Sequence, residues 1–245
     1  MNAVVELNES VNRNTRIIEN LGEYTAGNFH VKSTPVRYRD SDGVTFSAPD
    51  KKVLYRTDTG DCLNVVGRRY KIAQYKDTWK AAERILINSE LDLTGLARSM
   101  EQSHNGGRAY AIYTLPAYTI ETGKGDATAL QVLAYSSFDG SWSFSLETGY
   151  VRMICTNRQV SVVGFSIYKS KHTPRLDIDL GVTKIGGILQ NYEEEQERWK
   201  RWRRISVSDR EAFDTFAVAA KCKFPKARPD LTINKLLEEP EVYRN

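Results

Sequence analysis

Cysteine is scarce in this chain, which has three among 245 residues. Cys62, Cys155 and Cys222 are odd in number and far apart, so we expect neither a disulfide framework nor a paired-cysteine metal site. No apolar run approaches the roughly 20 residues that cross a bilayer, and the N-terminal residues lack the basic-then-apolar pattern of a secretory leader. A cytoplasmic protein with no membrane partner is therefore expected.

Motifs that carry catalysis are also missing. The three histidines, His30, His104 and His172, show none of the spacings of a histidine metal site. Thr122–Thr128 reads TGKGDAT, which lacks the spacing of a phosphate-binding loop and suits a hairpin turn better. No nucleophile elbow and no supported cysteine–histidine pair is present. We therefore expect a binding protein that is not an enzyme and needs no metal or cofactor.

Residues 31–70 have the pattern of strands and hairpins. Stretches rich in Val and Tyr are separated by DG, PD and TGD turns. A helix is expected next, with Asp77 as its N-cap. The apolar stripe of that helix consists of Ala81, Ala82, Ile85 and Leu86.

Residues 108–155 show the clearest strand pattern. Alternating apolar runs flank Asp139-Gly140, a dipeptide that strongly favours a hairpin between strands. A further strand is expected after Thr148-Gly149. Together these runs predict an antiparallel β-meander with helices packed on one face, which is an α+β fold class.

Three parts are expected along the chain. Residues 1–30 are polar and Asn-rich, which predicts a flexible N-terminal arm or a short helix that a partner must order. Residues 31–228 are expected to form a single α+β domain, and residues 229–245 an acidic C-terminal tail. Late in the domain, Ser208 and Glu211 predict a capping box. The core-facing side chains of the capped helix are expected to be Phe213, Phe216, Ala217 and Ala220.

Positive charge is concentrated in residues 198–228. This stretch has ten lysines and arginines and three acids, a local net charge of +7 in a chain whose overall charge is +4. Clustered cations beside aromatic rings suit a polyanion that carries stackable bases. The alternative is that the tryptophans anchor a helix and the cations form a solvated face. The candidate residues are Trp199, Lys200, Arg201, Trp202, Arg203 and Arg204.

Four arginines elsewhere are further candidates for nucleic-acid contacts. Arg68 and Arg69 lie in a hairpin that reads GRRYK. Arg108 follows Asn105-Gly106-Gly107, whose glycines suit either a turn or a close approach to phosphate. Arg152 precedes a CTN turn and suits either a groove or a buried ion pair.

Several phrases together resemble one family of phage- and plasmid-borne proteins, the domain of unknown function 932. They are GDCLNVVGRRYKIAQYKD, GGRAYAIYTLP, LQVLAYSSFDGSWSFSLETGYVRMICTNRQV and SKHTPR, and the resemblance covers roughly residues 55 to 205. The motifs of the family correspond to Phe138-Asp139-Gly140-Ser141, to Arg152 with Cys155 and Asn157, and to His172-Thr173. Phe138 stands where many relatives carry histidine. The resemblance implies an origin in a mobile element and implies no activity.

A meander with an adjoining helix and a basic groove also resembles, in architecture only, the Rad52-like and Redβ-like single-strand annealing proteins. These proteins form rings or filaments along single-stranded DNA. We therefore expect a homo-oligomeric phage or mobile-element protein that binds and anneals single-stranded DNA without ATP, alongside a host or phage recombination protein. One alternative is a protein that binds and inhibits a host factor. Another is a metal-dependent nuclease with scattered acids, Asp58, Asp61, Asp126 and Asp139.

Overall fold

The computed structural model describes residues 2–123, 126–153, 160–189, 197–198, 201 and 204–223. The chain divides into two compact units, Met1–Glu195 and Gln196–Asn245. This division differs from the expected domain over residues 31–228. The physical reason on the N-terminal side is that Ile18 and Ala26 are buried, 8% and 2% exposed, so the first thirty residues belong to the first unit. The expected acidic tail, residues 229–245, lies outside the described residues.

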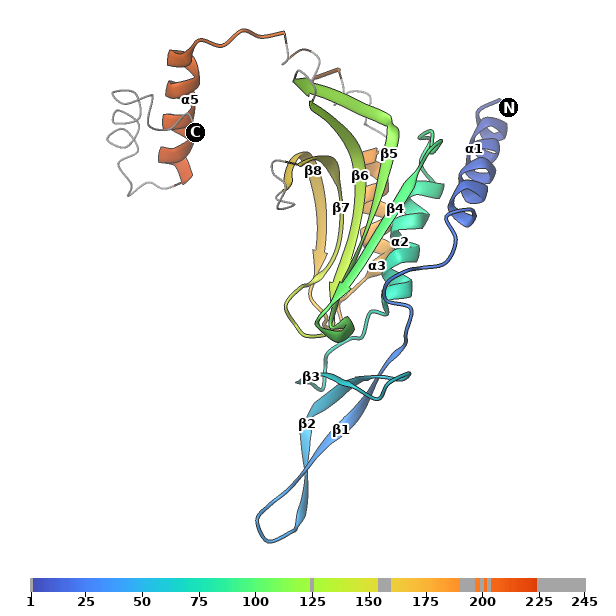
Figure 1. Ribbon diagram of the computed structural model, residues 1–245, viewed down its shortest axis with the longest axis vertical. Helices are drawn as coiled ribbons and strands as arrows, with labels where there is room; N and C mark the ends of the chain where they lie inside the picture. The colour runs from blue at the N-terminus through green and yellow to red at the C-terminus, as the bar shows by residue number, and fades with distance from the viewer. Residues whose placement is uncertain are drawn as a thin grey trace. The chain divides into compact units, whose positions relative to one another are not determined.

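The first unit contains two antiparallel sheets (Figure 1). The smaller sheet contains β1 (Val31–Arg39), β2 (Thr45–Arg56) and β3 (Cys62–Gly67), in that order. The larger is a five-stranded meander of β4 (Ala97–Ser103), β5 (Arg108–Gly123), β6 (Asp126–Ser137), β7 (Phe144–Met153) and β8 (Val160–Ser170). A 3-10 turn, η1 (His104–Gly106), joins β4 to β5. The α+β class and the expected meander are confirmed.

Alternation along the strands places one face of the larger sheet in the core. On β5, Ala109, Ala111, Tyr113 and Leu115 are at most 1% exposed, as the period of two predicts. The hairpin at Asp139-Gly140 joins β6 to β7 as expected. The separate strand expected after Thr148-Gly149 is wrong, because these residues belong to β7, which continues through the dipeptide with a shift in its pairing to β8.

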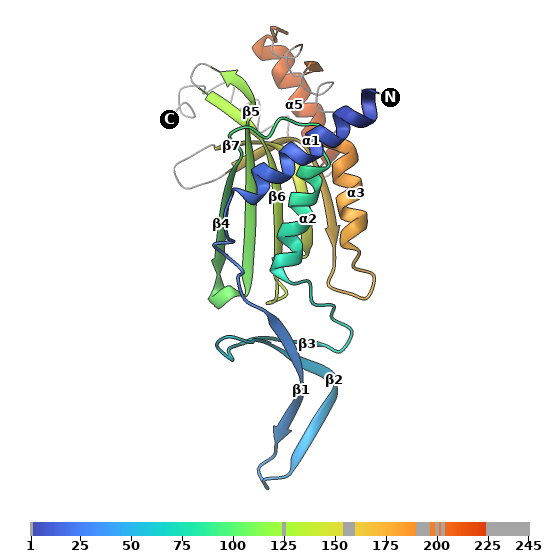
Figure 2. The same cartoon turned by 90° about the vertical axis from the view of Figure 1, so that its right-hand side faces the viewer.

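Two helices, α2 (Tyr75–Ile87) and α3 (Ile178–Leu189), cover that face (Figure 2). The predicted apolar stripe of α2 is confirmed, since its four residues are at most 1% exposed. The predicted N-cap at Asp77 is wrong, because the helix begins at Tyr75 with Gln74 as its N-cap. The Gln74 side chain accepts a hydrogen bond from the Val31 amide (3.0 Å) and donates one to the Val31 carbonyl (2.8 Å), so a contact with β1 sets this end.

The N-terminal residues form helix α1 (Asn2–Glu19), which packs on α2. The buried Asn14 amide donates to the carbonyls of Leu86, Ser89 and Leu91 at 3.1–3.4 Å. These carbonyls lie at and beyond the end of α2, where backbone acceptors lack helical partners. Where the sequence predicts a flexible arm or a helix ordered by a partner, the structure has a helix whose partner is the chain's own core.

The second unit contains helix α5 (Asp209–Lys223). Its capping box is confirmed: the Ser208 amide donates to a Glu211 carboxylate oxygen (2.9 Å), and the Glu211 amide donates to the Ser208 hydroxyl (3.3 Å). The expected burial of Phe216 is wrong, because its side chain is 71% exposed. Among the described helices of both units, none is long and apolar enough to cross a membrane.

Candidate nucleic-acid interface

A groove lies where the smaller sheet meets the end of β8. It measures about 780 Å³ and is lined by three segments, Pro49–Lys51, Gly67–Tyr70 and His172–Thr173. The first segment is a bulge in β2, because Pro35 pairs with Lys52 whereas the next residue, Val36, pairs with Ala48. We call this feature the junction groove. It brings together the GRRYK hairpin and the His-Thr pair, which are about one hundred residues apart in the sequence.

Arg68 and Arg69 lie on the rim of the junction groove, and both are exposed. Their backbone is held in a turn, in which the Arg68 amide donates to the Asp50 carbonyl (2.8 Å) and the Tyr70 amide to the Gly67 carbonyl (2.9 Å). Within the part of the chain that the structure describes, neither guanidinium has an ion-pair partner. Two adjacent cations are therefore fixed at their Cα positions while their charges stay available to an anion.

Tyr70 and His172 form the base of the groove as a stacked pair, with ring centroids 4.8 Å apart and planes 11° apart. The Tyr70 hydroxyl donates to the Ser137 carbonyl (2.9 Å), which ties the groove to β6. His172 Nδ1 lies 3.2 Å from the Lys71 carbonyl and therefore carries the proton, so Nε2, 3.3 Å from the Ser136 hydroxyl, is the acceptor. Burial lowers the pKa of His172 and outweighs the Lys71 hydrogen bond, so the ring is neutral at neutral pH.

Arg108 is held by Asp139 of the FDGS turn. Its Nε lies 2.5 Å from an Asp139 carboxylate oxygen, and its guanidinium lies 5.9 Å from the Trp142 ring. Burial opposes the ionisation of Asp139, but hydrogen bonds from Ser141 and Arg108 outweigh it and lower the pKa of the carboxyl. Arg108 therefore positions the FDGS turn, whereas Arg68 and Arg69 have no ion-pair partner among the described residues.

The glycines before Arg108 form a turn that packs against the Phe29 ring. Gly106 adopts φ +84°, and a Cβ there would lie 2.5 Å from the Phe29 ring. Of the two alternatives that the sequence allows, a turn and a close approach to phosphate, the structure has the turn.

Phe138, the first residue of the FDGS turn, is fully buried. Its ring packs at 4.5 Å on that of Tyr75, whose hydroxyl donates to the Gly106 carbonyl (2.9 Å). Phe138 is thus part of the core. Ser137 and Ser136, which precede it, bond to Tyr70 and His172, so the FDGS turn and the junction groove share one support.

The family profile described as Domain of unknown function (DUF932) matches residues 62–236. The chain belongs to the DUF932 family. No curated protein matches the chain, and no solved structure does. In this DUF932 chain the FDGS turn, the His-Thr pair and the GRRYK hairpin all meet at one end of the larger sheet.

Arg152 of the DUF932 chain lies elsewhere. It pairs with Ser161 near the end of β7, whereas Phe144, which follows the FDGS turn, begins that strand. Eight residues of extended strand separate them, which is on the order of 25 Å. Arg152 and the junction groove are therefore at opposite ends of the sheet.

The basic cluster of the second unit is described in part. Arg201 and Arg204 are exposed, and the Arg204 amide donates to the Arg201 carbonyl (3.0 Å). The other four candidates, Trp199, Lys200, Trp202 and Arg203, lie outside the described residues.

Three of the four acids considered for a nuclease have partners of their own. Asp58 pairs with Arg56 at 2.7 Å, and Asp61 accepts a hydrogen bond from Asn105 at 2.8 Å. Asp139 is engaged by Arg108, and of Asp126 the structure describes only the backbone. No group of three or more metal-ligating side chains occurs among the residues that the structure describes.

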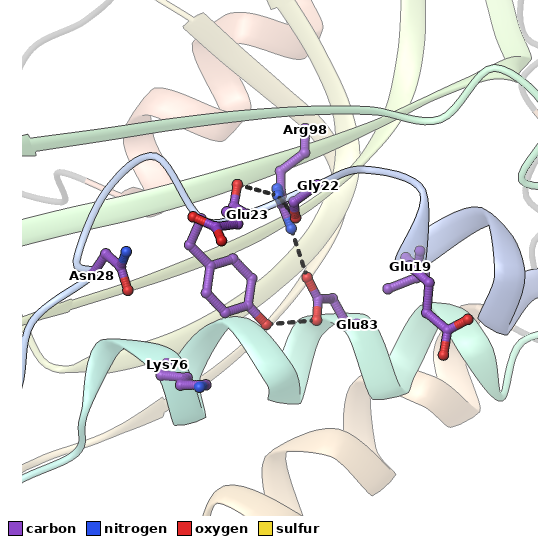
Figure 3. A pocket seen from close by; sticks show the side chains of 9 residues that line it. Glu19, Gly22, Glu23, Asn28, Lys76, Glu83 and Arg98 are labelled. Atoms are coloured by element: carbon purple, nitrogen blue, oxygen red, sulfur yellow. Dashed lines mark hydrogen bonds and ion pairs between the residues drawn. The ribbon is translucent and has the colours of Figure 1, made fainter.

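A second pocket lies between α2 and the loop after α1, and the Glu83 side chain in its lining is bonded to two others, Tyr24 and Arg98 (Figure 3). Glu83 accepts hydrogen bonds from Arg98 (3.1 Å), Tyr24 (2.8 Å) and Tyr113 (3.0 Å). Arg98 also donates to three backbone carbonyls of residues 21–23. Burial, reinforced by the hydrogen bond to Glu83, raises the pKa of both tyrosines. The network joins the N-terminal segment to the sheet and is complete without a ligand.

Sequence reasoning missed this network, although a signal for it exists. Glu83 follows Trp79 by four residues and so lies in the apolar stripe of α2. A carboxylate in a buried stripe requires a buried cation or several donors.

Proposed function

We propose that this DUF932 protein binds single-stranded DNA and anneals it without ATP, as a homo-oligomer in the cytoplasm of the host of a phage or related element. The observation that carries the proposal is the pair Arg68 and Arg69, which are exposed on the rim of the junction groove and have no ion-pair partner among the described residues. Lys51, 51% exposed and 4.0 Å from Asp50, adds a third cation. Three cations spaced along one groove suit a phosphate backbone.

The contrast with the other arginines supports this choice. Arg56, Arg84, Arg98 and Arg108 each form an ion pair of 3.1 Å or less, so their charges are already used inside the fold. A cation kept without a carboxylate loses little on meeting a phosphate, because no internal pair must break. Arg201 and Arg204, both exposed, extend the same chemistry in the second unit.

Salt dependence of binding to a fluorescein-labelled 60-mer of dT tests the proposal. The logarithm of the association constant should fall by about 0.7 per phosphate contact for each log unit of salt. The double variant Arg68→Ala/Arg69→Ala should lower that slope by about 1.4, as measured by fluorescence anisotropy. The matched control, Lys80→Ala/Arg84→Ala on α2, removes the same net charge and should leave the slope within error of wild type.

Annealing and assembly need separate measurements. Wild type should speed the pairing of two complementary labelled strands without ATP, and mass photometry should show an oligomer whose mass grows with the oligonucleotide. Absence of binding to any oligonucleotide at low salt would refute the proposal. A host protein that stays bound in a pull-down after nuclease treatment would instead support the alternative that the chain inhibits a host factor.

A further inference from the structure

The β1–β2 hairpin of the smaller sheet continues well beyond the part that pairs with β3 (Figures 1 and 2). β3 pairs with β2 only over Lys51–Tyr55, and the bulge at Pro49–Lys51 separates that part from the rest. Residues 36–48 therefore form a two-stranded ribbon, which we call the tip ribbon. An isolated two-stranded ribbon is only marginally stable in water, so one of this length benefits from a partner.

One face of the tip ribbon is apolar and open. Tyr38 and Phe46 pair across the strands with ring centroids 5.6 Å apart and planes 22° apart. They are 55% and 43% exposed, and Val44 beside them is 52% exposed. Val36 and Ala48 lie on the same face, because side chains alternate along a strand. Clustered exposed apolar side chains of this kind mark binding surfaces.

The other face of the tip ribbon is basic. Arg37 pairs with Ser47 and Arg39 with Thr45, so both arginines lie opposite the aromatic rings. Both are exposed, and among the described residues neither has an ion-pair partner. The nearby carboxylate of Asp40 instead accepts hydrogen bonds from the amides of residues 42 and 44, at 3.0 and 2.8 Å, which close the turn.

Charge decides between the two occupants that an open aromatic pair suits. If a second copy of the chain covered the aromatic face, Arg37 and Arg39 would stay on the opposite face, where none of the described residues forms an ion pair with them. The phosphates of a nucleic acid complement the charges of Arg37 and Arg39, and its bases can stack on the outer ring faces. Unpaired bases fit better than a duplex, in which stacking hides the faces of the bases.

We propose that the tip ribbon binds single-stranded nucleic acid, with Tyr38 and Phe46 stacking on bases and Arg37 and Arg39 contacting phosphates. This inference rests on the proposed function and adds a second contact region to it. The ribbon would extend the path of the strand beyond the junction groove, since Pro49–Lys51 belongs to the groove and directly follows the ribbon.

Two probes separate base stacking from phosphate contact: a labelled 30-mer of dT and an abasic 30-mer with the same sugar–phosphate chain. The variant Tyr38→Ala/Phe46→Ala should bind the dT oligonucleotide about tenfold more weakly or worse and the abasic one as wild type does. Arg37→Ala/Arg39→Ala should weaken both. The matched apolar control is Val65→Ala, 51% exposed on β3, which should change neither.

Three results would overturn the inference. If the aromatic variant binds dT like wild type while Arg68→Ala/Arg69→Ala loses it, the tip ribbon is not a binding site although the proposed function stands. If wild type binds neither probe, the proposed function fails and takes this inference with it. If the aromatic variant alone changes the oligomeric mass without an oligonucleotide, the ribbon binds a second copy. Circular dichroism should show unchanged folding in every variant, because none of the substituted side chains is buried.

Discussion

Removal of the Glu83 carboxylate should be among the most destabilising single changes in the first unit. The Arg98 and Glu83 side chains are 5% and 10% exposed and lie 3.1 Å apart. Loss of one partner of a buried pair costs about 3–5 kcal/mol, because the remaining charge stays buried and uncompensated. The hydroxyls of Tyr24 and Tyr113 also lose their acceptor. We therefore expect Glu83→Ala to cost about 5 kcal/mol, at the upper end of that range.

The ion pair of Arg84, the residue after Glu83, provides an exposed control for this buried pair. Arg84 pairs with Asp179 at 2.6 Å, but these side chains are 52% and 77% exposed. Exposed pairs contribute about 0.2–1 kcal/mol, so Asp179→Ala should cost no more than that. Both free energies of unfolding can be measured by urea denaturation followed by far-ultraviolet circular dichroism.

A complete loss of folding in Glu83→Ala is a realistic result, since single domains are stable by only about 5–15 kcal/mol. Glu83→Gln keeps an acceptor oxygen for the tyrosines and removes only the charge. It should still cost clearly more than Asp179→Asn. Equal losses in these two variants would refute the reasoning, because burial of the pair would then have no energetic consequence.

Three further predictions concern smaller contacts. Burial lowers the pKa of His172 in the folded protein, so as pH falls below about 6.5 the unfolded chain takes up a proton before the folded chain does. Wild type should therefore lose more stability than His172→Gln between pH 7.5 and 5.5, as measured by urea titrations. Ser208→Ala should weaken α5 by about 1 kcal/mol, seen as faster amide hydrogen exchange in its first turn. Gly106→Ala should cost about 1–3 kcal/mol or more by thermal unfolding, because its Cβ would lie 2.5 Å from the Phe29 ring. Gly43 also has a positive φ, but an added Cβ there would meet no neighbouring atom, so Gly43→Ala should cost less than Gly106→Ala.

The sequence predicts strands and helix faces well here, because alternation and helical spacing are local properties. The five-stranded meander and the α2 stripe follow from them. The ends of elements follow less well, since distant contacts decide them: Gln74 begins α2 through its bonds to Val31. For the same reason α1 could not be placed, because the carbonyls that Asn14 binds lie more than seventy residues away. Phe216 shows the converse error, because it is an apolar residue at helical spacing whose side chain is exposed.

In the candidate site, residue type alone does not predict which arginines are available to bind an anion. Arg68, Arg98 and Arg108 are equivalent in composition, yet Arg98 is buried with Glu83, Arg108 holds the FDGS turn, and only Arg68 is exposed without an ion-pair partner in the described structure. The difference arises because carboxylates from distant segments, Glu83 of α2 and Asp139 of the FDGS turn, reach Arg98 and Arg108, whereas none among the described residues reaches Arg68. Local charge density therefore identifies cations that could meet a polyanion, whereas three-dimensional pairing decides which of them can. By that criterion, substitution of Arg68 should weaken DNA binding and spare stability, whereas substitution of Arg98 should do the reverse.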